Sequence, residues 1–283
     1  MFEKFSRSWA LIKASASVLG KDKELLVFPA VSAVAGLMVA ASFIAPLIWW
    51  SMGHPQAFNQ GETSPLWYLY AFIFYFVQYF VIFFFNTALV GAASMRLEGR
   101  DPTVSDGLRI AWSKVRIILA YAAIAATVGM ILRAIEQRAG WIGKWIAGLF
   151  GAAWTVVTFM VVPVLVHRDI GPIDAIKESA SLLKQTWGEN LIGQGGVGLI
   201  FMLFYFGLWM ACGALFVVSV GSGSLGLMIT IGVLGVLGTL GLALIQTALQ
   251  GIYSAALYRY AVGHENSAEF SGPLLQNAFA HKK

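Results

Sequence analysis

The sequence contains little charge. Only 12% of its 283 residues are Asp, Glu, Lys or Arg, against about 25% in ordinary soluble domains, whereas 58% are apolar. A water-soluble domain needs a charged and polar surface, so this composition excludes an ordinary soluble globule. The net charge of +5 does not call for a nucleic-acid partner, because the basic loops of a membrane protein give the same excess.

Cysteine and familiar catalytic motifs are also scarce. The single cysteine, Cys212, cannot form an internal disulfide. The four histidines are not spaced as zinc ligands, and the sequence has no P-loop, nucleophile elbow or zinc-protease motif. Gly193, Gly195 and Gly198 fit a G-x-G-x-x-G pattern, but the strand and the acidic residue of a dinucleotide site are missing. The sequence therefore predicts no catalytic, cofactor-binding or metal-binding residues.

Long apolar segments fill most of the chain. A helix needs about 20 residues to cross a hydrocarbon layer about 30 Å thick. We predict spans at residues 25–50, 66–93, 115–132, 145–166, 191–220 and 225–257. Because a lipid environment leaves the backbone to satisfy its own hydrogen bonds, these spans are helices. The predicted fold class is all-α, with a single polytopic membrane domain over residues 1–283 that contains six transmembrane helices.

Basic residues predict how the spans are oriented. Lys and Arg near span ends are found mainly on the cytoplasmic side. Of the 19 in this chain, 16 lie before the first span, after the last, or in the second-to-third and fourth-to-fifth connections. The other three, Arg133, Arg138 and Lys144, lie in the third-to-fourth connection. Both termini are therefore predicted to be cytoplasmic. Glu136 follows Arg133 by three residues, which is a spacing that allows a local ion pair.

A short polar segment recurs before three of the spans. Ile12–Leu19 and Ile176–Leu183 share six of eight residues at an offset of 164, and Asp106–Arg109 aligns with Asp174–Lys177. The six spans then form three pseudo-repeated hairpins, each preceded by a cytoplasmic amphipathic helix.

Each of these segments has apolar residues at helical spacing. The predicted stripes are Phe5, Trp9, Ile12, Ala16 and Leu19; Val104, Leu108, Trp112 and Val115; and Ile173, Ile176, Ala180, Leu183 and Trp187. Pro102 and Pro172 fit the opening turns of the second and third helices. We expect the helices to lie along the inner membrane surface, with these interfacial anchors: Trp9, Lys13, Arg109, Trp112, Lys177 and Trp187. They either connect the spans as part of the bundle or sense lipid.

The even-numbered spans share a signature centred on threonine. Asn86–Gly91 in the second span matches Gln246–Gly251 in the sixth, and Thr158–Pro163 in the fourth keeps the threonine and adds a residue that bends the chain. Side-chain amides in lipid need partners, so we expect Gln78, Asn86, Gln246 and Gln250 to face the bundle interior. The candidate intramembrane polar cluster is Gln78, Asn86, Thr87, Thr158, Gln246, Thr247 and Gln250. It either forms interhelical hydrogen bonds or lines a path for a solute.

Three segments carry a family resemblance: Phe2–Trp9, Lys21–Pro29, and the tail Tyr258–Ala261 with Phe270, Leu274, Leu275, Ala278 and Phe279. They resemble a bacterial six-span membrane family catalogued as a domain of unknown function. The layout is also similar to the membrane domain of some glycerophosphodiester phosphodiesterases, without their catalytic domain. The resemblance implies residence in the bacterial cytoplasmic membrane and supplies no site residues.

Two kinds of function remain open on the sequence alone. The first is a non-enzymatic membrane component that binds lipid or a protein partner through its inner-surface helices. The second is a transporter or channel for a small or lipidic solute, with the amides as its lining. An intramembrane enzyme ranks third, since no cluster of acids, histidine or serine stands out. The expected partners are membrane lipids and either another protein or a second copy of the chain, and not nucleic acid.

Overall fold

The computed structural model describes residues 2–53, 65–138, 140–185, 187–221, 223–263 and 270, with backbone alone for residues 2–8, 138, 142 and 185–196. These ranges contain α-helices, one 3₁₀ helix and no strand. The α-helices are α1 (Phe2–Lys21), α2 (Val27–Gly53), α3 (Pro65–Leu97), α4 (Val104–Ser113), α5 (Val115–Arg138), α6 (Gly140–Thr158), α7 (Val161–His167), α8 (Pro172–Gln185), α9 (Trp187–Gly221) and α10 (Leu225–Ala261), and the 3₁₀ helix η1 (Lys23–Leu26) joins α1 to α2.

Six helical segments are long and apolar enough to cross a membrane, which confirms the six predicted spans. They are Lys23–Gly53, Pro65–Leu97, Val115–Gln137, Gly143–His167, Val197–Gly221 and Leu225–Ala261. The third runs further than predicted, to Gln137. Many of their large apolar side chains are exposed, such as Trp49, Phe206 and Val217. Surfaces of this kind suit lipid and not water. The chain is an integral membrane protein with a polytopic helical fold.

Contacts between residues divide the chain into two compact units. Unit 1 consists of Met1–Leu26, Ala93–Asp101 and Gln185–Lys283, and unit 2 of Val27–Ala92 and Pro102–Lys184. Unit 1 therefore contains α1, α9 and α10, whereas unit 2 contains α2, α4 to α8 and most of α3. The single membrane domain expected from the sequence stays a prediction.

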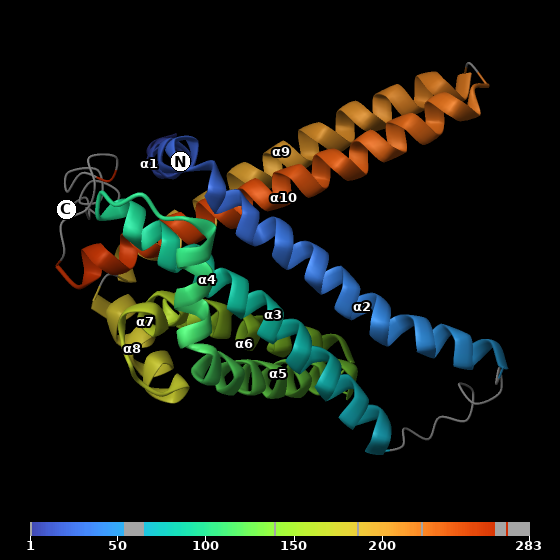
Figure 1. Ribbon diagram of the computed structural model, residues 1–283. Coiled ribbons are helices and arrows are strands. Elements are labelled where there is room, and N and C mark those ends of the chain that lie inside the picture. The colour runs from blue at the N-terminus through green and yellow to red at the C-terminus, as the bar shows by residue number, and fades with distance from the viewer. Residues whose placement is uncertain are drawn as a thin grey trace. The chain divides into compact units, whose positions relative to one another are not determined.

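Aromatic side chains hold the helices of unit 2 together. In the α2–α3 hairpin, Phe43 packs edge-on against Tyr70 at a ring-centroid distance of 5.3 Å, and Tyr70 donates a hydrogen bond of 2.5 Å to the Phe43 carbonyl oxygen. Phe83 of α3 packs on Tyr121 of α5 with centroids 4.5 Å apart. Helices α5 and α6 form the second hairpin of this unit (Figure 1).

Unit 1 is built on the α9–α10 hairpin, whose two helices run side by side in Figure 1. Small residues bring them close together. A Cβ atom on Gly235 would lie 3.4 Å from Cys212 Sγ, and one on Gly238 would lie 3.1 Å from the Leu208 methyl groups. Helix α1 packs against both α9 and α10. Close approach at small residues is the usual way in which membrane helices associate.

The fourth span is broken. Helix α6 ends at Thr158 and α7 begins at Val161, with a turn at Phe159 and Met160. Pro163 explains the position of the break, because a proline ring collides with the carbonyl of the residue four positions earlier, here Phe159. The chain-bending role predicted for Pro163 is confirmed.

Different signals open the two short helices of unit 2. Pro172 is the first residue of α8, as predicted. Helix α4 instead has Thr103 as its N-cap, in a capping box with Asp106. Pro102 precedes that cap and is not part of the first turn, so the prediction for Pro102 was wrong by two residues.

The predicted apolar stripes of α1, α4 and α8 are only partly buried in the structure. Ile12, Leu19 and Leu183 are buried, whereas Trp9, Ala16, Trp112 and Ile173 are exposed. Val104, Leu108, Val115, Ile176 and Ala180 are only part-buried. The side chains of Phe5 and Trp187 lie outside the described part of the chain. The buried side of each helix is centred about one residue earlier than the predicted stripe.

Candidate functional site

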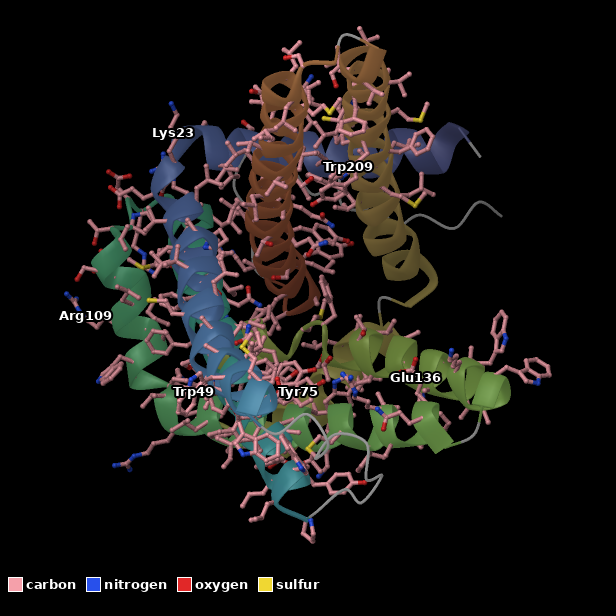
Figure 2. The ribbon with its side chains drawn as sticks, turned by 90° about the vertical axis from the view of Figure 1, so that its right-hand side faces the viewer. Lys23, Trp49, Tyr75, Arg109, Glu136 and Trp209 are labelled. Atoms are coloured by element: carbon pink, nitrogen blue, oxygen red, sulfur yellow. The ribbon has the colours of Figure 1, made fainter. Side chains whose placement is uncertain are left out.

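The interfacial anchors predicted from the sequence are exposed wherever their side chains are described. The predicted anchors Trp9 and Trp112 are 46% and 68% exposed, although both are large and apolar, and Ile173 of α8, which was not predicted as an anchor, is 59% exposed. Lys13, Arg109 and Lys177 are exposed on the same helices, α1, α4 and α8. Figure 2 shows the Arg109 side chain pointing away from the ribbon of α4. The anchor prediction for Trp187 concerns a side chain that the structure does not describe.

The opposite sides of these helices bury residues at matching positions, and all of these except Leu11 are small. Leu11, Gly107 and Ala175 are buried at one position, and Ser15, Ala111 and Ser179 at the next turn. The approach is closest at Gly107, where a Cβ atom would lie 2.5 Å from Phe28 Cζ and 2.8 Å from the Ala88 carbonyl oxygen. Small residues therefore let α4 rest directly on the α2–α3 hairpin.

Ser179 connects α8 to the break in the fourth span. Its hydroxyl donates a hydrogen bond of 2.6 Å to the Val157 carbonyl oxygen and accepts one of 3.1 Å from the Met160 N–H. Ser179 and Met160 are completely buried. One side chain thus satisfies two backbone groups that the turn at Phe159 and Met160 leaves without regular helical partners.

Three members of the predicted intramembrane polar cluster contact a neighbouring helix within their own unit. Gln78 packs on Gly36 of α2, where a Cβ atom would lie 3.1 Å from Gln78 Nε2. Gln246 Oε1 accepts a hydrogen bond of 3.1 Å from the Tyr205 hydroxyl of α9. Thr158 lies beside Tyr121 of α5, and its hydroxyl donates a hydrogen bond of 2.7 Å to the Trp154 carbonyl oxygen of its own helix. These contacts fit the interpretation in which the polar residues join helices.

The other members of the predicted cluster make no such link. Thr87 is completely buried and donates to the Phe83 carbonyl oxygen one turn earlier. Asn86 is part-buried. Thr247 and Gln250 are exposed, and Thr247 donates to the Ala243 carbonyl oxygen of its own helix. The expectation that all four amides face an interior is therefore not met by Gln250 within unit 1. The seven residues are divided between the units, with four in unit 2 and three in unit 1, so the cluster as a whole stays a prediction.

Unit 1 contains a charged cluster that the sequence did not predict. Arg259 of α10 donates a hydrogen bond of 2.7 Å to Glu98, and Arg96 donates one of 2.7 Å to Asp101. Glu98 is also paired with Arg100. The Arg259 side chain is only 11% exposed. The cluster fixes the end of α3 to the end of α10.

Asp22, between α1 and η1, is a buried acid of unit 1. The residue is 6% exposed, and its Oδ2 atom has no hydrogen-bond partner. Burial raises the pKa of Asp22 above its ordinary value of 3.8, although the charge of Arg96 and a hydrogen bond from the Glu24 backbone act in the opposite direction. The folded state therefore holds this proton more tightly than the unfolded state does.

Asp22→Asn is expected to raise the melting temperature at neutral pH. A carboxyl whose folded pKa lies above its unfolded value destabilises the fold once it ionises, so its stabilising contribution at low pH is lost as the pH rises through the folded pKa. The gain from the variant should therefore shrink as the pH falls toward about 4. Melting curves of the purified protein against pH measure both effects. A variant that melts below the wild type at neutral pH would contradict the assignment.

Asp169→Asn is the matched control for this measurement. Lys114 hydrogen-bonds to exposed Asp169, and this bond together with the lysine charge holds the pKa of Asp169 below its usual range. Asp169 should stabilise the fold at neutral pH and lose that contribution as the pH falls, which is the opposite sign to Asp22. Lys114 also donates to the Arg168 carbonyl oxygen at 3.3 Å, and so it ties the end of α4 to the end of α7.

A polar pocket lies where α5 leads into α6. It has a volume of about 380 Å³ and is lined by Tyr75, Tyr79, Gly129, Leu132, Arg133, Glu136, Lys144, Ala147 and Gly148, all in unit 2. Arg133 Nη1 donates a hydrogen bond of 2.6 Å to the Tyr75 hydroxyl. Tyr75 and Glu136 are labelled in Figure 2. The spacing of Arg133 and Glu136 was the only sign of this pocket in the sequence.

A second, apolar hollow of about 360 Å³ adjoins the polar pocket. It is lined by Lys144, Trp145, Gly148 and Leu149, so Lys144 and Gly148 belong to both. Trp145 and Leu149 are exposed on α6. One face of α6 therefore presents a polar recess beside an apolar one.

Comparison with known proteins adds a family and no activity. The sequence profile described as "Family of unknown function (DUF6159)" matches residues 66–268. This match covers most of the chain, including five of the six spans. No curated protein matches the sequence. The layout shared with the glycerophosphodiester phosphodiesterase membrane domain stays a prediction.

Proposed function

Because the chain belongs to the DUF6159 family, whose function is unknown, we propose its function from the structure: it is a non-enzymatic component of the cytoplasmic membrane that binds anionic lipid through α1, α4 and α8. A single observation supports this proposal. Each of the three helices exposes a large apolar side chain and a basic one at helical spacing: Trp9 with Lys13, Trp112 with Arg109, and Ile173 with Lys177.

The chemistry of a membrane surface matches these exposed pairs. An exposed tryptophan or isoleucine is unfavourable in water, but it is stabilised at the boundary between headgroups and acyl chains. A lysine or arginine beside it meets the lipid phosphates. Arg109 and Lys177 also pair with Asp106 and Asp174 on their own helices, at 3.5 Å and 3.1 Å. Exposed pairs of this kind contribute only about 0–1 kcal/mol, so lipid phosphate can compete for the basic groups.

We also infer that the three helices are internal repeats, as their sequences suggest. At the offset of 164 residues, Leu11, Ser15, Val18 and Leu19 match Ala175, Ser179, Leu182 and Leu183, and all eight are buried. The exposed positions match as well, since Lys13 and Ser17 correspond to Lys177 and Ser181. A shared pattern of buried and exposed positions supports a common origin for the segments.

The proposal places both ends of the chain in the cytoplasm. Six crossings return the chain to the side on which it started, and most of the basic residues then lie on that side. We do not propose a transport function. Gln246 is engaged by Tyr205 within its own hairpin, and Gln78 is packed on Gly36, so these amides act between helices.

The test removes the three exposed basic groups together. The variant carries Lys13→Gln, Arg109→Gln and Lys177→Gln, and the probe is phosphatidylglycerol titrated into the detergent-purified protein. Each basic group near an anionic surface contributes about 1 kcal/mol, so the apparent affinity from the melting-temperature shift should fall about 100-fold. Binding by the wild type should also weaken with salt.

Two controls accompany this experiment. The charge-conserving variant Lys13→Arg, Arg109→Lys and Lys177→Arg should bind as the wild type does. Lys21→Gln with Lys184→Gln removes exposed charge from α1 and α8 outside the three pairs and should cost less than tenfold. Wild-type affinity in the triple glutamine variant would overturn the proposal.

A further inference from the structure

The polar pocket between α3, α5 and α6 carries charge of both signs at one end of unit 2. Arg133 and Glu136 lie in the last turns of α5, and Lys144 lies in the second turn of α6. These positions are at the ends of the third and fourth spans. Arg133 lies 18 residues beyond Val115, the first residue of α5, which at 1.5 Å per residue places the pocket about 27 Å from the end of α5 that adjoins α4. The pocket is therefore at headgroup depth and separate from the helices that carry the proposed function.

Two tyrosines form one wall of the pocket. The rings of Tyr75 and Tyr79 stack with centroids 6.5 Å apart. Gly129 of α5 leaves room for them, because a Cβ atom there would lie 3.3 Å from the Tyr79 hydroxyl. The hydrogen bond from Arg133 to Tyr75 holds the guanidinium at this wall. The pocket thus offers two cations, one carboxylate, hydroxyl groups and aromatic surface.

We propose that this pocket binds the phosphoethanolamine headgroup of a membrane phospholipid. Arg133 and Lys144 bind the phosphodiester, for which guanidinium and ammonium groups are the usual protein partners. Glu136 and the tyrosines bind the primary ammonium group, through the carboxylate charge and the faces of the rings. The pocket therefore has charges of both signs, and a zwitterionic headgroup can pair with all of them. A purely anionic headgroup would leave Glu136 without a positive partner, and a neutral headgroup would pair with none of the charges. The volume of about 380 Å³ lies within the range of small-ligand pockets.

The adjoining apolar hollow indicates a lipid and not a free phosphate ester. Trp145, Gly148 and Leu149 continue from the polar pocket along the exposed face of α6, past Lys144. An acyl chain that leaves a headgroup bound at Lys144 would lie on this surface. Free phosphoethanolamine has no acyl chain that could lie on this apolar surface.

Gly148 gives the sharpest test, because it lines both hollows and no other group lies within 4 Å of a Cβ atom there. Gly148→Leu should therefore fill the site without disturbing the fold. Retention of phosphatidylethanolamine and phosphatidylglycerol by the detergent-purified protein is measured by native mass spectrometry. The wild type should prefer phosphatidylethanolamine, and Gly148→Leu should reduce its binding at least tenfold with an unchanged melting temperature. Gly213→Leu, at another open helical glycine in unit 1, should bind as the wild type does.

Charge variants then test how the headgroup is recognised. Glu136→Gln should abolish the preference for phosphatidylethanolamine over phosphatidylglycerol, whereas Arg133→Gln and Lys144→Gln should each weaken phosphatidylethanolamine binding at least tenfold. Arg109→Gln, on α4, should leave phosphatidylethanolamine binding unchanged even if anionic-lipid binding at the inner surface is lost, which separates this site from the proposed function. A wild type without preference, or a preference that survives Gly148→Leu and Glu136→Gln, would overturn the assignment. If free phosphoethanolamine bound as tightly as phosphatidylethanolamine, the assignment of a membrane lipid as the ligand would be overturned.

Discussion

Ser179→Ala is expected to lower the free energy of unfolding by about 2–4 kcal/mol. The substitution removes one hydroxyl, but two buried backbone groups lose their partner: the Val157 carbonyl oxygen at 2.6 Å and the Met160 N–H at 3.1 Å. A buried polar group left unsatisfied costs about 1–3 kcal/mol, and the buried position of Ser179 leaves little access for water to replace the hydroxyl. Equilibrium unfolding of the purified protein, followed by helical circular dichroism, measures the loss.

Ser181→Ala is the control for Ser179→Ala. It makes the same chemical change two residues away on α8, where the side chain is exposed. A surface change of this kind should alter the stability by no more than about 0.5 kcal/mol. Equal destabilisation by the two variants would show that the hydroxyl of Ser179 does not support the helix break.

Helix α4 has no hydroxyl at the position that matches Ser179, and the comparison shows why α8 needs one. Ala111 occupies the matching position of α4, which rests on α3, and α3 runs unbroken from Pro65 to Leu97. An unbroken helix satisfies its own backbone, so a small apolar residue is enough for close packing. The break that Pro163 imposes on the fourth span creates the two groups that Ser179 satisfies.

The spans were predictable from sequence because lipid allows few solutions. A backbone in hydrocarbon must satisfy its own hydrogen bonds, so an apolar segment of about 20 residues becomes a helix whatever its neighbours do. The six predicted spans therefore agree with the six in the structure. The break within the fourth span followed from one residue, Pro163, for the same local reason.

The buried sides of the short helices were not predictable by the same reasoning. The spacing of apolar residues identified the helices, but it did not show which of those residues face the protein and which face lipid. Trp9, Trp112 and Ile173 are exposed, and the buried sides use small residues such as Gly107 and Ser179. At a membrane surface lipid can cover the large side chains, while close packing selects for small ones.

The charged cluster of unit 1 and the polar pocket of unit 2 were not predictable from sequence for a different reason. Arg259 meets Glu98 across 161 residues of sequence, and the polar pocket combines Tyr75 with Lys144 from separate hairpins. Neither pairing has a local pattern, because each depends on how helices pack. Only Arg133 and Glu136, three residues apart on α5, were visible as a pair, and Arg133 is bonded to Tyr75 instead.

Glu98→Leu is expected to lower the free energy of unfolding by about 2–4 kcal/mol, more than Arg259→Leu does. Removing one partner of a fully buried ion pair costs about 3–5 kcal/mol, and the 33% exposure of Glu98 reduces that figure. Glu98→Leu should be the more destabilising of the two changes because Arg259 is more deeply buried than Glu98. The Arg259 side chain is 11% exposed, so the loss of the Glu98 carboxylate acts on a poorly solvated charge, whereas Glu98 without Arg259 keeps both water and Arg100.

A double-mutant cycle on Glu98→Leu and Arg259→Leu isolates the coupling between the two side chains. The double variant should be more stable than the sum of the single losses predicts, because it leaves no buried charge behind. Asp101→Ala supplies the comparison, since it breaks the Arg96 pair of similar length at a carboxylate that is almost fully exposed, and it should cost at most about 1 kcal/mol. If Asp101→Ala were as harmful as Glu98→Leu, the burial of Arg259 would not be what sets the strength of the link between α3 and α10.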